Sequence, residues 1–99
     1  MQSFYAEQFE RDMACTEAEW LGWLPAAIGA HRYELRAGSA RVALDGGELQ
    51  LQWQVQPARV IALIRLPRLA VRFAFRGVPD GTRHAFMQRF DLYTQRGGG

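Results

Sequence analysis

The first apolar positions of the chain recur at a helical spacing. Large apolar side chains stand every four residues, at Tyr5, Phe9 and Met13. This stripe, with Arg11 on the opposite side, is typical of an amphipathic helix whose apolar face covers a sheet. Ser3 is a residue type that caps helices, so we expect the first helix to begin there and to end near Ala14.

A second helix is predicted directly after the first. Thr16 and Glu19 have the spacing of a capping box, in which each side chain accepts a hydrogen bond from the other residue's backbone. One side of this helix is apolar, at Trp20, Trp23, Leu24, Ala27 and Ile28. Pro25 should bend or end the helix because its ring removes a backbone donor, and Gly29 closes the region.

Beyond the second helix the apolar period changes to two, which predicts strands joined by tight turns. A type II′ turn at Gly38–Ser39 would place Leu35 opposite Val42. A type I′ turn at Asp45–Gly46 would place Val42 opposite Leu49. Both turns put the same apolar residues on one face, so we expect a three-stranded meander with one side against the core.

The next segment is apolar on both faces. Residues 59–66 contain Val, Ile, Ala, Leu and Ile in succession, which predicts a strand that is central or covered on both sides. Pro67 then marks either a turn between two strands or a bulge in one bent strand. We favour the turn, because eighteen extended residues would reach about 60 Å, whereas a domain of this size has a radius of gyration near 13 Å.

Alternating residues predict a final hairpin. Its first strand would turn Leu69, Val71, Phe73 and Phe75 inward, and its second would turn Phe86, Phe90 and Leu92 inward. Val78 to Gly81 would form the connecting turn. The predicted fold is therefore α+β, with two N-terminal helical segments packed on an antiparallel β-meander of five to six strands. We expect one domain over residues 1–94 and a flexible tail at 95–99.

The composition bears on the compartment of the protein through its single cysteine and its lack of a long apolar run. The chain has 99 residues, of which 48% are hydrophobic, enough for one core without disulfides. Its single cysteine excludes an intramolecular disulfide and a cysteine-based zinc site. The acidic start does not resemble a secretory signal, and no run reaches the roughly eighteen apolar residues of a membrane helix. We therefore expect a cytoplasmic protein without a membrane partner.

Arginine is the most unusual feature of the composition. All 12 basic residues are arginine. Five of these arginines form a row on the outer face of the predicted last hairpin: Arg68, Arg72, Arg76, Arg83 and Arg89. Guanidinium groups suit carboxylates and phosphates, so this row predicts binding to an acidic protein or a small anionic ligand. The alternatives are a solvated row paired with the acidic helices, and burial in a homodimer.

Two further function classes follow from the aromatic residues. Nucleic-acid binding through the arginine row is disfavoured, because the phenylalanines that could stack on bases share the inner face. A small-molecule pocket between the second helix and the sheet is the stronger alternative, and an enzyme would fit there. Its lining would be Trp20, Trp23, Trp53, Phe90 and His84. Ordinary core packing explains the same spacing.

Chemistry-bearing residues are few. His31 and His84 would stand at strand beginnings, without a carboxylate or nucleophile that the sequence can place nearby. Cys15 precedes a helix start, which could activate a thiol, but a packed thiol is the more common state. We therefore predict no catalytic residue, no metal and no cofactor, and a non-catalytic binding or interaction module.

Overall fold

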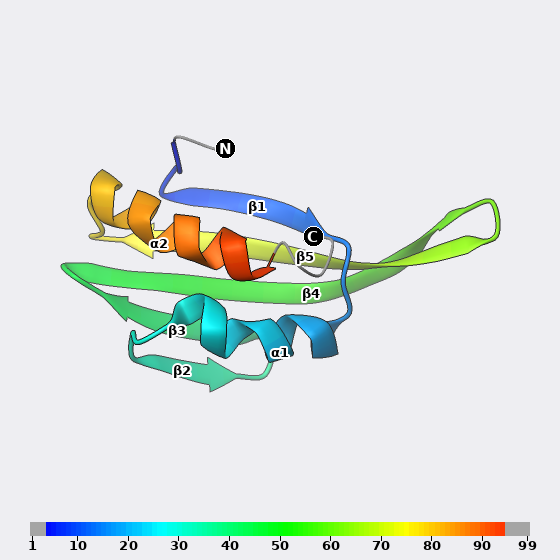
Figure 1. Ribbon diagram of the computed structural model, residues 1–99, viewed down its shortest axis with the longest axis horizontal. Coiled ribbons are helices and arrows are strands. Elements are labelled where there is room, and N and C mark those ends of the chain that lie inside the picture. The colour runs from blue at the N-terminus through cyan, green and yellow to red at the C-terminus, as the bar shows by residue number, and fades with distance from the viewer. Residues whose placement is uncertain (1–3, 95–99) are drawn as a thin grey trace.

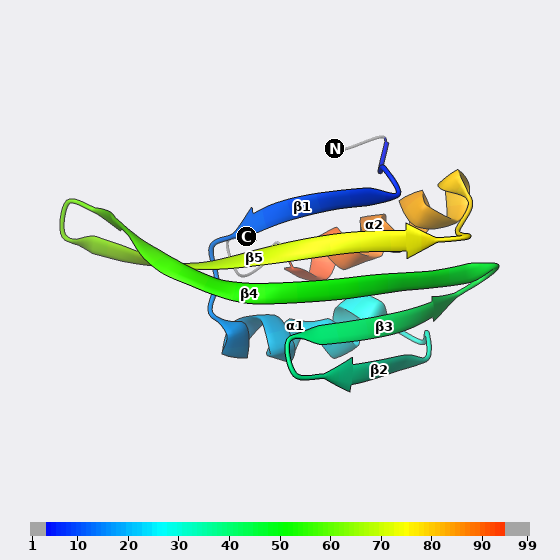
Figure 2. The same cartoon turned by 180° about the vertical axis from the view of Figure 1, so that it is seen from behind.

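The protein is a two-layer α+β structure, seen in a computed structural model that describes residues 4–94. A five-stranded antiparallel sheet forms one layer, and both helices lie on the same face of it (Figures 1 and 2). The elements are β1 (Gln8–Met13), α1 (Glu17–Ile28), β2 (Tyr33–Arg36), β3 (Ser39–Leu44), β4 (Gly47–Ile61), β5 (Ile64–Arg76) and α2 (Asp80–Thr94). Ser3 and the predicted tail at 95–99 lie outside the described residues.

The strand order is β1-β5-β4-β3-β2, so the sheet is a meander completed by the first strand at its far edge. Neither described helix has the length and apolar content needed to cross a bilayer. Within residues 4–94 the other face of the sheet carries no helix, and we call it the open face (Figure 2). The fold class is thus confirmed, but the helices are not both N-terminal and the sheet has five strands.

The predicted first helix is wrong, because this segment is the edge strand β1. A spacing of four residues fits a period of two as well as a helical period, since four is an even number. Arg11 distinguishes the two: a helix would turn it away from Phe9 and Met13, whereas a strand places all three on one face. In the structure Arg11 lies on the helix-covered face, half-buried against the rings of Phe9 and Phe73.

The second predicted helix is confirmed as α1, including its start. The Thr16 hydroxyl accepts from the Glu19 backbone N–H at 3.1 Å, and the Glu19 carboxylate accepts from the Thr16 N–H at 2.9 Å. Pro25 does not end the helix, which continues to Ile28. Gly29 then takes a positive φ of 73°, a conformation that glycine adopts at little cost.

One of the two predicted turns has the predicted register. Val42 lies opposite Leu49 across the Asp45–Gly46 connection, as predicted. Only Gly46 of these two residues has positive φ, so the turn is not type I′. Leu35 lies opposite Ala40 rather than Val42, a shift of two residues. Because side chains alternate with a period of two, that shift leaves the same residues on the same face.

The region around Pro67 differs from the prediction. Residues 59–66 are not one strand: they end β4, turn at Ala62 and Leu63, and begin β5. Pro67 lies inside the continuous strand β5, and the irregularity is a bulge in β4 opposite it. The hairpin projects past the rest of the sheet, which is how a 13-residue strand fits a molecule with a long axis of 47 Å.

The predicted last strand is the helix α2. Phe86 and Phe90 are four residues apart, so their spacing again fits both periods, and the helical set is completed by Arg83, Met87 and Thr94. Pro79 provides the first turn of this helix, since its carbonyl accepts from the Arg83 N–H at 2.9 Å. The Pro-Asp-Gly sequence therefore begins a helix instead of closing a hairpin.

The core lies between the helices and the covered face of the sheet. Phe73 is fully buried, as the alternation in its strand predicts, and Phe90 is fully buried on α2. Their rings meet edge to face at 5.5 Å. Trp20 from α1 contacts both Phe90 and Trp53, which joins the two helices to the centre of the sheet. This single core leaves two surfaces without a covering layer, the open face and the projecting hairpin.

Candidate functional site

The most distinctive surface is the part of the β4–β5 hairpin that extends beyond the sheet. Pairing with β1 ends at Leu69, and pairing with β3 ends at Gln52. From the Gln56–Arg68 pair to the turn, the two strands therefore pair with no other described strand, and we call residues 56–68 the arm. Figure 1 shows it reaching away from both helices along the long axis of the molecule.

A bulge marks the base of the arm. Between Gln56 and Arg59, β4 contains two residues where β5 has only Pro67 between Arg68 and Leu66. One extra residue reverses the sides to which β4 directs its side chains. Past the bulge Arg59 and Ile61 therefore lie on the side of the open face.

Two prolines face the outer edges of the arm. The Phe75 N–H donates to Glu7 in the β1 segment, so odd-numbered residues of β5, including Pro67, direct their backbone groups to that edge. The Trp53 N–H donates to Gly38, which places Pro57 on the opposite edge by the same alternation. Each proline thus removes a donor that would otherwise face outward, a common protection of free strand edges.

The end of the arm is aliphatic and exposed. Leu63 at the turn is 101% exposed, Ile64 60%, Val60 59% and Ile61 54%. With Leu66 these residues form what we call the aliphatic tip: Val60, Ile61, Leu63, Ile64 and Leu66. Ala62 in the turn has a φ of 55°, which a residue with a Cβ rarely adopts. Four of the five apolar side chains of the tip are therefore more than half exposed to water.

Basic residues surround the aliphatic tip without acidic neighbours in the sequence. Arg59 lies opposite Leu66 and Arg65 lies opposite Val60. No Asp or Glu occurs between Glu48 and Asp80, a stretch that contains five arginines. Across the base of the arm, Asp12 of β1 lies 3.9 Å from Arg59 and 3.0 Å from Arg68. The far part of the arm is therefore both apolar and positively charged.

The predicted row of five arginines is divided between the two faces of the sheet. Arg68 and Arg72 lie on the open face, and Arg76 follows them at the end of β5. Arg68 bonds to Asp12, and Arg72 lies 3.8 Å from Glu10. These pairs match the alternative in which the arginines are solvated and paired, although the acids belong to β1 instead of a helix.

The other two predicted arginines have structural partners on α2. Arg83 is buried and donates to the carbonyls of Tyr5 and Val78 at 3.0 and 2.7 Å. Arg89 donates to the Ala26 carbonyl at 3.2 Å and stacks on Tyr93. Both tie α2 to neighbouring segments, so they cannot join Arg68 and Arg72 in one binding surface.

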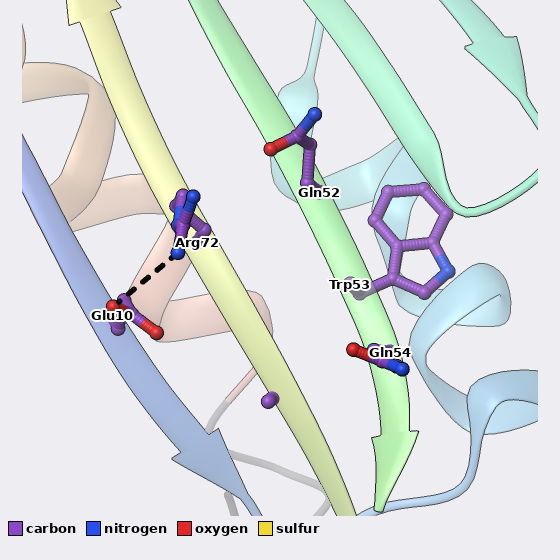
Figure 3. A pocket seen from close by; sticks show the side chains of 6 residues that line it. Glu10, Gln52, Trp53, Gln54 and Arg72 are labelled. Atoms are coloured by element: carbon purple, nitrogen blue, oxygen red, sulfur yellow. Dashed lines mark ion pairs between the residues drawn. The ribbon is translucent and has the colours of Figure 1, made fainter.

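A shallow depression of about 240 Å³ lies on the open face. Ala70 and longer side chains from β1, β4 and β5 line it, and Figure 3 shows the longer ones. Glu10 and Arg72 stand on one side and Gln52 and Gln54 on the other, and the ion pair of Glu10 with Arg72 crosses between β1 and β5. The depression has a mixed polar and apolar lining and is open to solvent, so it does not enclose a ligand.

The residues predicted to line an aromatic pocket fill space instead of enclosing it. Trp20 is fully buried, and its ring centroid is 5.6 Å from that of Trp53 and 5.8 Å from that of Phe90. Trp23 is partly buried against the same cluster. His84 lies apart from it, with its ring 5.9 Å from Tyr5. The ordinary-core alternative thus describes the tryptophans, apart from the buried indole N–H of Trp20, which has no hydrogen-bond partner among the described residues.

The titratable groups that contact one another form structural links. Asp91 accepts from Arg11 and from the Tyr5 hydroxyl, which donates at 2.7 Å. Burial, together with the hydrogen bond and charge of Asp91, raises the pKa of Tyr5. Burial acts to lower the pKa of Arg11, but the bond and charge of Asp91 outweigh it and raise that pKa. The described residues contain no cluster of three potential metal ligands.

Cys15 is a packed thiol. It is fully buried, and burial followed by the negative charge of Glu19 raises its pKa. A raised pKa keeps the thiol protonated at neutral pH, the opposite of activation at a helix start. His31 packs beside the Phe86 ring at 5.6 Å.

Comparisons with protein-family models, curated proteins and solved structures found no match. The sequence analysis missed the arm because a run that is apolar on both faces was interpreted as a central strand. The signal that could have found it is the pair of prolines that encloses this run at 57 and 67.

Proposed function

We propose that this protein is a non-catalytic binding module and that the arm is its contact element. The observation that supports this is the exposure of five aliphatic side chains at the end of a hairpin with no covering layer. Burying one such side chain contributes about 1.5–3 kcal/mol. Contiguous exposed apolar surface of this kind marks interaction sites.

The arm contributes little to the stability of the fold, so stability does not explain its length. An isolated two-stranded ribbon has marginal stability in water, and the core is complete without residues 59–66. A contact with another molecule would cover the tip and stabilise the ribbon. The predicted anionic character of the partner is retained, because Arg59 and Arg65 lie among the aliphatic residues.

The arm takes the place of the arginine row as the main binding surface that we propose. Arg68 and Arg72 are paired on the open face, and Arg83 and Arg89 support α2. The same division removes the row on which nucleic-acid binding would depend. A small-molecule pocket among the tryptophans has less support, since their rings contact one another. A homodimer through the open face has less support than a contact at the arm, because the open face is polar.

The test measures whether the arm is covered in the cell, whatever covers it. Leu63→Cys places a thiol at the tip, and Ala43→Cys places one on the exposed open face as a matched control. Cys15 is buried and should stay unlabelled in the folded protein. We expect a membrane-permeant maleimide to label both variants equally when purified, and to label Leu63→Cys several-fold more slowly inside cells.

Equal labelling of Leu63→Cys in cells and in the purified state would contradict the proposal. Slow labelling of Ala43→Cys alone would contradict it as well, and would move the contact to the open face.

A further inference from the structure

We infer that the aliphatic tip inserts into the surface of an anionic lipid bilayer. This inference rests on the proposed function, because it names the partner that the arm contacts. Four features of the arm support it. The tip has apolar side chains on both sides, and prolines interrupt its strand edges. Arginines lie beside the apolar side chains, and the body of the molecule does not shield the tip.

The tip carries exposed apolar side chains on both sides and at the turn. Ile61 and Ile64 pair on the side of the open face, whereas Val60 lies on the side of the helices. Leu63 extends from the turn and is fully exposed. A hairpin that docks on a protein surface needs one apolar side, since its other side faces water. Apolar side chains on both sides and at the turn suit a medium that surrounds the tip, as hydrocarbon does.

The edges of the arm are unsuited to strand addition. Pro57 and Pro67 face the two outer edges and remove a donor from each, so another strand would find an interrupted ladder. Pairing of two arms edge to edge, and addition of a peptide as an extra strand, both depend on that ladder. The tip therefore has to act through its side chains.

The charge of the arm selects an anionic surface. Arg59 and Arg65 lie beside the aliphatic residues, and among the described residues Arg65 has no acidic partner. A second copy of the arm would bring the same positive charges against these. Each arginine near an anionic membrane surface contributes about 1 kcal/mol to binding. Arginine can also extend its head group toward phosphates while its stem stays among lipid chains.

The shape of the molecule leaves the tip accessible to a flat surface. The arm projects at one end of the long axis, and both helices and the other strands lie behind it (Figures 1 and 2). A bilayer could thus contact the turn without meeting the body. The sequence-based expectation of no membrane partner considered only a spanning helix. Insertion of a hairpin tip needs only a few aliphatic residues and does not cross the bilayer.

The experiment measures binding of the full chain to vesicles by co-sedimentation. Vesicles of phosphatidylcholine mixed with phosphatidylglycerol are compared with vesicles of phosphatidylcholine alone. We expect binding to the anionic vesicles and weakening at high salt. An environment-sensitive fluorophore on Leu63→Cys should shift to the blue when these vesicles are added, which reports entry into an apolar medium.

Two sets of variants separate the apolar and charged contributions. The triple variant Ile61→Ser, Leu63→Ser and Ile64→Ser should bind about a thousandfold more weakly or worse. Arg59→Gln with Arg65→Gln should bind about thirtyfold more weakly to anionic vesicles, because two charges near the surface are lost. Arg32→Gln with Arg36→Gln is the matched control, since it removes two exposed charges far from the arm. It should bind within about threefold of the unaltered chain.

Three results would overturn the inference. The first is no binding to either vesicle, and the second is equal loss in the control and arm arginine variants. The third is a dimer in sedimentation equilibrium that the triple variant abolishes, because a second copy would then cover the tip. If the tip is nevertheless protected from maleimide in cells, the proposed binding function stands and only the lipid partner is wrong.

Discussion

The Asp91 carboxylate of α2 accepts hydrogen bonds from both terminal nitrogens of Arg11 in β1, at 2.5 and 3.1 Å. These bonds join the last helix to the edge strand. The Tyr5 hydroxyl donates to the same carboxylate, and the Arg11 guanidinium lies over the Phe9 and Phe73 rings. The two charged side chains are only 25% and 20% exposed. This link fixes the first strand, which has a neighbour on one side only.

We predict that Asp91→Ala lowers the free energy of unfolding by about 2 kcal/mol, because it leaves a partly buried guanidinium and a phenol without their acceptor. Urea denaturation monitored by circular dichroism measures the change. Glu48→Gln is the control, since its ion pair with Arg41 is exposed and should contribute less than about 0.5 kcal/mol. Equal effects of the two variants would show that the Asp91 link is not stabilising β1.

The buried thiol of Cys15 predicts a loss of stability at alkaline pH. Its pKa is raised in the folded state, so the folded protein keeps the proton to higher pH than the unfolded chain does. Stability from this group is complete below the ordinary thiol pKa of about 8.5 and declines as pH rises through the folded value. Cys15→Ala should therefore show a flatter dependence of unfolding free energy on pH above that point. Denaturation curves over a pH series measure it, and an unchanged slope would contradict the prediction.

Gly47 begins β4 where the backbone of β5 passes very close. A Cβ at this position would lie 1.7 Å from the Arg76 carbonyl oxygen, which is backbone and cannot move aside cheaply. We predict that Gly47→Ala destabilises the protein by about 3 kcal/mol. Gly22→Ala is the matched control: no atom lies within 4 Å of its added Cβ, and alanine favours a helix by up to about 1 kcal/mol. Thermal unfolding of both variants should show shifts of opposite sign.

The aliphatic tip should be dispensable for folding. The triple variant Ile61→Ser, Leu63→Ser and Ile64→Ser removes only exposed side chains. Relative to the unaltered chain, each substitution should therefore change the free energy of unfolding by no more than about 0.5 kcal/mol. Phe73→Ala, in the core, should cost about 3–5 kcal/mol in the same assay. A comparable loss in the triple variant would mean that the tip supports the fold, and the case for a binding role would weaken.

The sequence by itself determined α1, the Val42–Leu49 register and the buried face of β5 from Leu69 to Phe75. Local rules govern each of these: a capping box needs only Thr16 and Glu19, and alternation sorts side chains within one strand. An error of two residues in the first hairpin did not change which side chains are buried, for the same reason.

Only the tertiary structure decided whether the first and last segments form a strand or a helix. Tyr5, Phe9 and Met13, like Phe86 and Phe90, recur every four residues, and that distance fits a strand and a helix equally well. The choice depends on partners far along the chain: β5 offers an edge that β1 can pair with, and Asp91 supplies the acceptor that lets Arg11 lie on the covered face. The arm was hidden for a related reason. Whether residues 59–66 cross the centre of a sheet or project beyond it depends on where the neighbouring strands end, and no local pattern contains that information.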